Sequence, residues 1–118
     1  IAKNIRRGEI DAIFHLAGHY FDAQEVAESE LVSRLRILHI VPPEDLSTGG
    51  HFGYAGDYLA TGKQAAKIAD KVFRVTRPSD IPLEFIGKNR LVLHLVRATQ
   101  AGIKFTEFMI SIADEVVK

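Results

Sequence analysis

Residues Tyr54 to Val75, YAGDYLATGKQAAKIADKVFRV, form a tight loop followed by a long helix in the fold that this sequence predicts. Gly53 and Gly56 allow a sharp backbone turn, and Asp57 can cap the first free N–H groups of a helix. Behind Asp57, small or apolar residues recur every three or four positions, which indicates a helix over 57–74. The smallest members of this stripe predict that the helix lies close against a sheet: Gly62, Ala66 and Ala69.

Upstream of this stretch, two apolar runs fit buried strands, Ile10–Leu16 and Ile37–Val41. Between them, Asp22 and Glu25 form a capping box that opens a helix over 22–34. The order strand, helix, strand, helix is typical of a parallel sheet with helical crossovers. We therefore expect a three-layer α/β/α fold, in which the two helices cover a mainly parallel sheet.

Downstream of Val75 the sequence changes to an extended connector with two prolines, followed by short apolar segments. Leu83–Ile86 and Arg90–Leu95 fit the two strands of a hairpin, and a final helix is predicted over 106–117. We expect one domain over 1–118 with three parts: a lobe-like core over 1–75, a hinge-like connector over 76–86, and a C-terminal strand and helices over 87–118.

Length and composition exclude several classes of protein. The chain has 118 residues, of which 47% are hydrophobic and 25% charged, as expected for one globular domain. The formal net charge is +0, so no global electric field recruits nucleic acid. The absence of cysteine excludes disulfides, thiolate catalysis and cysteine zinc sites. Because the chain begins at Ile1 rather than Met, we treat it as a mature or excised piece.

No set of residues has the spacing of a catalytic centre, so we expect no enzymatic activity and no cofactor. The serines lack a nucleophile-elbow context, and Ser47-Thr48-Gly49-Gly50 lacks the lysine of a phosphate loop. We also expect no metal, because no acidic or cysteine partner stands at ligand spacing from the five histidines: His15, His19, His39, His51 and His94. We interpret His39 and His94 as structural imidazoles within strands.

The string Gly56–Glu84, GDYLATGKQAAKIADKVFRVTRPSDIPLE, resembles a tract of ABC-transporter substrate-binding proteins, DYY-x-x-G-x-x-A-A followed by P-x-D-L-P-V-E. Further matches stand in the family's order: Ile10–Phe14 resembles its V-D-A-I-Y strand, and Ala113–Val116 resembles its A-D-E-V-I ending. The branch concerned has the type I periplasmic-binding fold and is sometimes associated with aromatic amino acids such as tryptophan. The resemblance covers essentially the whole chain, but only the C-terminal part of such a protein.

The resemblance implies a solute-binding domain that closes with a second lobe over a small molecule, possibly one like an amino acid, for uptake. It implies a membrane permease as partner and a periplasmic or extracytoplasmic location, with a membrane anchor if the full-length protein carries a lipoprotein signal. One alternative from another class stays open, a ligand-sensing or dimerisation domain excised from a signalling protein.

We expect the ligand to contact loops that leave the strand ends. Asp57 and Tyr58 would supply a carboxylate and a phenol for an amine and an aromatic or polar group. The alternative is that Asp57 only caps the helix and Tyr58 packs. The predicted pocket has six lining residues: Gly18, His19, Tyr20, Tyr54, Asp57 and Tyr58. The loop Leu16-Ala17-Gly18-His19 stands where the family often has P-T-D-N.

The segment from Leu91 to Lys118 predicts an interface. In the family this segment packs on a lobe encoded upstream, so seven apolar residues would be left partly uncovered: Leu91, Leu93, Leu95, Phe105, Phe108, Ile112 and Val116. An unpaired strand at Leu91–Leu95 would also template pairing with another chain. We therefore expect a two-fold homodimer, the alternative being that the tail closes the sheet within one chain.

Overall fold

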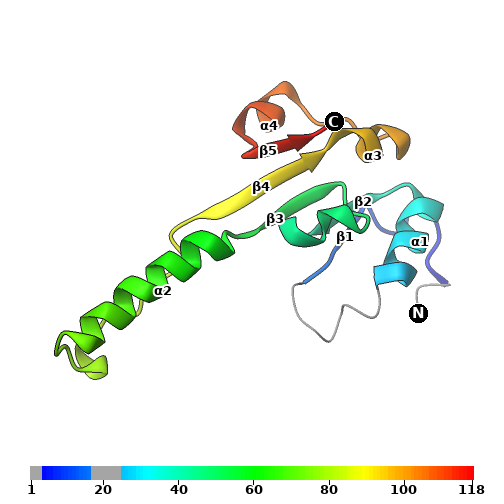
Figure 1. The fold of residues 1–118 in the computed structure, drawn as a ribbon. Coiled ribbons are helices and arrows are strands. Elements are labelled where there is room, and N and C mark those ends of the chain that lie inside the picture. The colour runs from blue at the N-terminus through cyan, green and yellow to red at the C-terminus, as the bar shows by residue number, and fades with distance from the viewer. Residues whose placement is uncertain (1–3, 17–24) are drawn as a thin grey trace. The chain divides into compact units, whose positions relative to one another are not determined.

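A computed structural model describes residues 4–16 and 25–118, and the strands in these residues form one sheet. The strands lie side by side in chain order, from β1 to β5 (Figure 1). Their bounds are Ala12–Phe14 (β1), Leu38–Val41 (β2), Phe52–Gly56 (β3), Asn89–His94 (β4) and Glu115–Val117 (β5). The helices between them are α1 (Glu25–Leu35), η3 (Pro43–Ser47), α2 (Tyr58–Phe73), η4 (Pro78–Asp80), α3 (Leu95–Gln100) and α4 (Glu107–Ile112).

The first three strands are parallel. Ile13 of β1 lies opposite His39 of β2, and Ile40 of β2 lies opposite Phe52 of β3. Helix α1 connects β1 to β2, which is the predicted strand–helix–strand unit. Parallel strands leave their carboxyl ends at one edge of a sheet, and the residues that follow β1 and β2 therefore share that edge.

The last two strands are also parallel to each other, but β3 and β4 are antiparallel. The His94 N–H donates to the His51 carbonyl at 2.9 Å, and just beyond the other end of β3 the Asp57 N–H donates to the Lys88 carbonyl at 2.9 Å. As residue number rises on one strand it falls on the other, which is the antiparallel pattern. The sheet is therefore mixed and mostly parallel, and the predicted α/β class is confirmed.

Two compact units make up the chain: unit 1 comprises 1–55 and 90–118, and unit 2 comprises 56–89. In unit 1, α1 buries Leu31, Val32 and Leu35, and the partly buried Ile13 packs against this cluster. These positions recur at helical spacing, so they form one apolar face of the helix. Arg36 ends α1 with a φ of 53°, a left-handed conformation that commonly terminates helices.

A second cluster in unit 1 holds the central strands together, and it consists of Val41, Leu46 and Val92, with Val117 packed against it. Two glycines are needed here for close approach, Gly50 and Gly53, although Gly53 was expected to allow a sharp turn. A Cβ on Gly50 would lie 2.3 Å from the Val41 Cγ2 atom, and one on Gly53 would lie 3.0 Å from the Pro43 Cα atom. Only glycine lets these segments pack so tightly.

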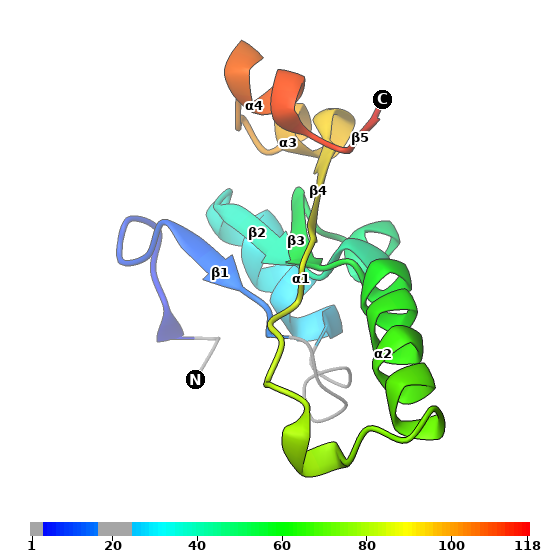
Figure 2. The same cartoon turned by 90° about the vertical axis from the view of Figure 1, so that its left-hand side faces the viewer.

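Unit 2 consists mainly of α2 and the segment that runs back beside it (Figure 2). The two are joined by polar contacts of Gln64, whose Nε2 donates to the Phe85 carbonyl at 3.0 Å and whose Oε1 accepts from the Gly87 N–H at 3.2 Å. Residues 83–86 form no strand, so the predicted hairpin is wrong. Their backbone is bound by the Gln64 side chain instead of by a neighbouring strand.

The small residues of α2 are not covered by the rest of unit 2, and their predicted contact with the sheet stays a prediction. Gly62, Ala66 and Ala69 are all exposed, α2 has no buried residue, and a Cβ on Gly62 would meet no atom within 4 Å. A stripe of small residues determines how closely another surface can approach a helix, but not which segment supplies that surface. Within unit 2, no segment does.

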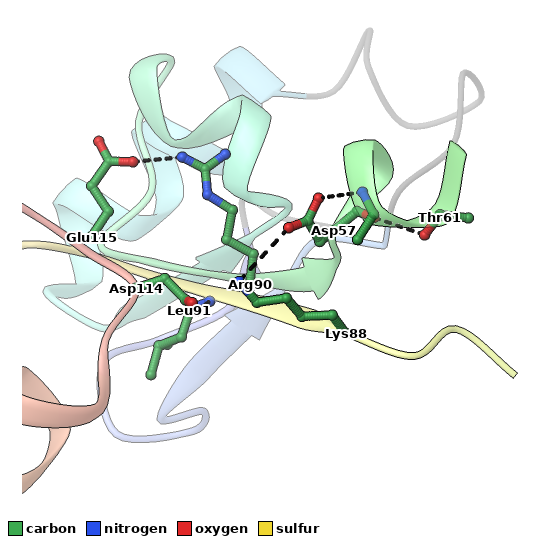
Figure 3. Close-up of polar contacts among 8 residues, drawn as sticks. Asp57, Thr61, Lys88, Arg90, Leu91, Asp114 and Glu115 are labelled. Atoms are coloured by element: carbon green, nitrogen blue, oxygen red, sulfur yellow. Dashed lines mark hydrogen bonds and ion pairs between the residues drawn. The ribbon is translucent and has the colours of Figure 1, made fainter. Parts of the chain in front are cut away.

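The predicted final helix over 106–117 is shorter, because α4 ends at Ile112 and β5 follows. The Leu91 N–H donates to the Asp114 Oδ2 atom and the Asp114 N–H donates to the Leu91 carbonyl, both at 2.9 Å (Figure 3). Arg90 also pairs with Glu115. These contacts fix the chain along β4, where the β-branched residues after Glu115 suit a strand.

The strand predicted to be unpaired is therefore paired on both sides, since β4 lies between β3 and β5. Leu93, which we expected to be partly uncovered, is fully buried. Two other members of that group do remain exposed on α4, namely Phe108 at 70% and Ile112 at 52%. None of the helices within residues 4–16 and 25–118 combines the length and the apolar character needed to cross a bilayer.

Candidate functional site

Asp57 lies directly after β3 and forms the N-cap of α2 (Figure 3). Its Oδ1 atom accepts a hydrogen bond from the Ala60 N–H at 2.9 Å. Its carbonyl oxygen accepts from the Thr61 N–H at 2.8 Å and from the Thr61 hydroxyl at 2.7 Å. The capping role predicted from the sequence is therefore confirmed, and it occupies one of the two carboxylate oxygens.

The other carboxylate oxygen of Asp57 faces a cation. Its Oδ2 atom lies 4.0 Å from the Lys88 Nζ atom, with the Asp57 side chain 21% and the Lys88 side chain 56% exposed. A solvent-exposed pair at this separation contributes little to stability. The Asp57 carboxylate can therefore receive the ammonium group of a ligand without losing its capping bond.

The two tyrosines of the predicted pocket belong to different units. Tyr58, the first residue of α2 in unit 2, is 56% exposed. Tyr54, in β3 of unit 1, is 45% exposed, and its ring centroid lies 6.4 Å from that of Phe52. Both residues are about half exposed, and a phenol can offer a ligand an aromatic face and a hydroxyl group.

The remaining three predicted pocket residues, Gly18, His19 and Tyr20, lie outside the described residues. The structure thus positions Tyr54, Asp57 and Tyr58, and it brings Asp57 and Tyr58 together at the start of one helix.

A group of buried side chains in unit 1 was not predicted as a site. The His15 Nδ1 atom lies 2.8 Å from the Glu28 Oε2 atom, and the His39 Nε2 atom lies 3.5 Å from the same oxygen. Both imidazoles are buried, each residue being 4% exposed, while the Glu28 side chain is 20% exposed. One carboxylate of α1 therefore serves two imidazoles, one at the end of β1 and one within β2.

Two further histidines accept hydrogen bonds from backbone amides. The His51 Nδ1 atom accepts from the His39 N–H at 3.1 Å, and the His94 Nδ1 atom accepts from the Arg97 N–H at 3.4 Å, which caps α3. Burial lowers the pKa of His51 to about 4, and burial followed by the charge of Arg97 lowers the pKa of His94. His94 is therefore a structural imidazole, as the sequence predicted, because its side chain caps α3. Its Nδ1 atom carries no proton when it accepts this bond.

Two cavities of unit 1 lie beside these histidines. The first, of about 540 Å³, is lined by nine residues: His15, Ser29, Glu30, Ser33, His39, Val41, Asp45, Thr48 and Gly49. The second, of about 440 Å³, shares four of these residues and adds Val32, Arg36, His51, Arg97, Gln100 and Ala101. Neither cavity is lined by the predicted pocket residues Tyr54, Asp57 or Tyr58. Within the part of the chain that the structure describes, no three His, Asp or Glu residues are grouped to hold a metal ion.

The residue that sequence reasoning missed is Glu28. It stands three and four residues before Leu31 and Val32, so it falls on the apolar inner stripe of α1. A carboxylate on such a stripe needs a buried partner, and that position is the signal that could have identified it.

No model of a protein family matches the sequence, and no curated protein matches it. Solved structures do match. The ABC domain in complex with L-Trp from Streptococcus pneumonia is 17% identical, with a TM-score of 0.77 over 92% of this chain and 37% of that chain. A conserved domain protein from Vibrio cholerae is also 17% identical, with a TM-score of 0.76 over 90% of this chain and 36% of that chain.

A third similar structure is the ligand-free, open form of a substrate-binding protein with adhesive properties from Clostridium difficile. It is 15% identical, with a TM-score of 0.71 over 94% of this chain and 37% of that chain. The chain thus spans little more than a third of the length of each of these proteins. The fold of this chain is therefore similar to part of the fold of each of these three proteins.

Proposed function

We propose that the chain is a non-enzymatic solute-binding domain, equivalent to one part of an ABC-transporter substrate-binding protein. The observation that carries this proposal is the fold match over at least 90% of the chain to three solved structures, one of them in complex with L-Trp and another a substrate-binding protein. A fold is shared by many functions, so the match supports the class of protein and the site must supply the chemistry.

The proposed ligand is a small molecule with an amino group, such as an amino acid. Asp57 supports this assignment, because its side chain is 21% exposed and its Oδ2 atom already lies 4.0 Å from a cationic group, the Lys88 Nζ atom. The exposed phenol of the adjacent Tyr58 would contact an aromatic or polar group of the same ligand. We keep Tyr54 and the loop residues Gly18, His19 and Tyr20 as further proposed contacts.

The rest of the proposal concerns the setting in which such a domain acts. A substrate-binding protein closes two lobes over its ligand by hinge motion, and the closed form is recognised by a membrane permease. We propose the permease as partner and an extracytoplasmic location, with a lipoprotein anchor where the full-length protein carries that signal.

We further propose that the chain by itself forms a homodimer through α4. Phe108 and Ile112 stand four residues apart, so they lie on one face of this helix, and both are exposed. Val96 of α3, at 45% exposure, adds to the exposed apolar surface of unit 1. Apolar surface of this kind usually marks an interface. Such an interface also fits the alternative role of this chain as a dimerisation or ligand-sensing domain.

A panel of amino acids tests the solute-binding proposal. A ligand that binds only the folded chain raises the temperature of thermal unfolding in proportion to the logarithm of its concentration. We expect this shift for at least one aromatic or other neutral amino acid. Unchanged unfolding temperatures across the whole panel would contradict the proposal.

A further inference from the structure

The His51 ring carries one N–H donor that no described residue satisfies. Its Nδ1 atom accepts from the His39 N–H at 3.1 Å, so the single proton of the neutral ring lies on Nε2. Burial lowers the pKa of His51 to about 4, and the ring is therefore neutral near pH 7. The residue is only 5% exposed, yet none of the residues that the structure describes accepts a hydrogen bond from Nε2. An acceptor supplied by another molecule would stabilise this donor.

This donor opens onto a cavity of unit 1. His51 lines the cavity of about 440 Å³, and its Nε2 atom is not sealed from solvent, whereas its Nδ1 atom is turned toward the His39 N–H. Helix α1 supplies two hydroxyl groups to the same wall, those of Ser29 and Ser33, and α3 supplies the amide of Gln100. The volume suits a small molecule rather than a single ion.

The charged side chains that line this cavity are two arginines. The guanidinium group of Arg36, directly after α1, has no hydrogen-bond or ion-pair partner among the described residues. The guanidinium group of Arg97 donates to the carbonyls of Leu46 and Ser47, which are neutral acceptors, so its charge is also uncompensated by a described residue.

Opposing negative charge at this cavity is small. No acidic side chain of residues 4–16 and 25–118 lines it, although two line the neighbouring cavity of about 540 Å³, Glu30 and Asp45. The carboxyl end of α1 contributes a partial charge of about −0.5. The two full positive charges of Arg36 and Arg97 exceed that contribution.

These groups favour an oxyanion with two negative charges. Guanidinium groups bind phosphate oxygens through paired N–H donors, and the His51 N–H group and the serine hydroxyls offer further donors from other directions. We propose that this cavity binds a phosphate group, either the free ion or the ester of a small molecule, which accepts from the His51 Nε2–H group and is neutralised by Arg36 and Arg97. None of Tyr54, Asp57 and Tyr58 lines this cavity, so the proposal does not rest on the amino-acid site.

Titration calorimetry at pH 8 and constant ionic strength tests the class of ligand with inorganic phosphate, glycerol 3-phosphate and acetate. A phosphate monoester is doubly charged there, since its second pKa is about 6. We expect saturable binding of at least one of the two phosphate compounds, with tighter binding of the ester or of the free ion identifying the natural form. Acetate carries one charge and should bind about tenfold more weakly or worse. No saturable binding of either phosphate compound, or equal affinity for acetate, would overturn the proposal.

Two variants locate the binding. Arg36→Asn removes one guanidinium group and should weaken phosphate binding by about tenfold. It should fold, because Arg36 has a φ of 53° and asparagine tolerates this left-handed conformation at helix ends. Arg34→Gln is the matched control, since it removes the same charge from α1 and should leave the affinity unchanged.

The control also tests another basic cavity, of about 530 Å³, which Arg34 lines together with Arg6 and Arg7. Those three arginines are exposed, and the cavity has no buried imidazole among its described lining residues. Wild-type affinity of a folded Arg36→Asn variant, or an equal loss in Arg34→Gln, would overturn the assignment to the cavity beside His51.

The wild-type chain provides a measurement that needs no variant. The ¹H and ¹⁵N chemical shifts of the His51 Nε2–H group report whether it donates to an anion. We expect both to move saturably as phosphate is added, and to stay unchanged when sodium chloride is added at the same ionic strength. Unchanged Nε2–H resonances at saturating phosphate, or an equal response to sodium chloride, would contradict the proposed contact.

Discussion

His39 and His51 are joined by a reciprocal pair of hydrogen bonds between neighbouring segments of the sheet. The His39 N–H donates to the His51 Nδ1 atom at 3.1 Å, and the His51 N–H donates to the His39 carbonyl at 3.0 Å. The His51 carbonyl in turn accepts from the His94 N–H at 2.9 Å. One buried imidazole thus replaces a backbone carbonyl as the acceptor between β2 and the start of β3, and it can do so only while its Nδ1 atom carries no proton.

This arrangement predicts that unit 1 loses stability in mild acid. The folded-state pKa of His51 is about 4 and its ordinary value is 6.5, so the unfolded chain binds the proton more readily. The stabilising contribution is complete above pH 6.5 and is lost as the pH falls from 6.5 to about 4. The loss is on the order of 3 kcal/mol for a shift of this size. His39 and His94 shift in the same direction and add to the loss.

Urea unfolding at a series of pH values measures this dependence. His51→Gln keeps a hydrogen-bond acceptor that does not titrate, so the variant should show a smaller decrease in unfolding free energy over the same range. Equal pH dependence in wild type and variant would show that His51 is not responsible.

Two glycines predict opposite effects of the same substitution. Gly50→Ala should destabilise the chain by about 1–3 kcal/mol, since its Cβ would lie 2.3 Å from the Val41 Cγ2 atom. Gly62→Ala should stabilise it by about 0.5–1 kcal/mol, because the new Cβ in α2 meets no atom within 4 Å. Thermal unfolding of both variants is the check. A destabilised Gly62→Ala variant would mean that this face of α2 is covered after all.

The features that the sequence predicted correctly depend on residues close together in the chain or on a continuous apolar run. The runs around Ile13 and Ile40 contain β1 and β2, and Asp57 caps the helix it was expected to cap. The C-terminal strand could not be predicted, because Val116 fits a helix or a strand and the choice depends on hydrogen bonds between Asp114 and the distant Leu91.

The candidate site was predictable only in part, for a related reason. Asp57 and Tyr58 are neighbours in sequence, so their placement at one helix terminus follows from the chain itself. His39 and Glu28 are separated by a helix and a turn, and their contact exists only in the folded unit. The small residues of α2 showed that a surface could come close, but they carried no information about which surface does.

Capping by Asp57 predicts a graded effect on stability. Asp57→Asn keeps an oxygen that accepts from the Ala60 N–H and should change the unfolding free energy by less than about 0.5 kcal/mol, whereas Asp57→Ala should cost about 1 kcal/mol. Urea unfolding of the two variants measures the difference. If both variants lose the same stability, then the loss comes from the Lys88 pair and not from the cap.

Association through α4 predicts a concentration-dependent mass. Light scattering at tens of micromolar should give twice the mass of one chain, and Phe108→Glu should give the monomer mass because it places a charge in the apolar interface. Phe73→Glu is the control, since Phe73 is 87% exposed but belongs to α2. A monomeric wild-type chain would contradict the dimer, and an equal effect of both variants would contradict the α4 interface.

Titration calorimetry with L-tryptophan, on the wild type and on Asp57→Asn, tests whether this chain binds an amino acid through Asp57. The matched control is Asp70→Asn, since Asp70 is an exposed carboxylate on the same helix that pairs with Arg74. The solute-binding account predicts saturable binding to the wild type and to Asp70→Asn. It also predicts about tenfold weaker binding to Asp57→Asn, with a smaller loss for the neutral analogue tryptophol, which lacks the amino group. Equal affinity of the three proteins for L-tryptophan would remove Asp57 from the site, and the absence of binding by this and every other amino acid would contradict the account itself.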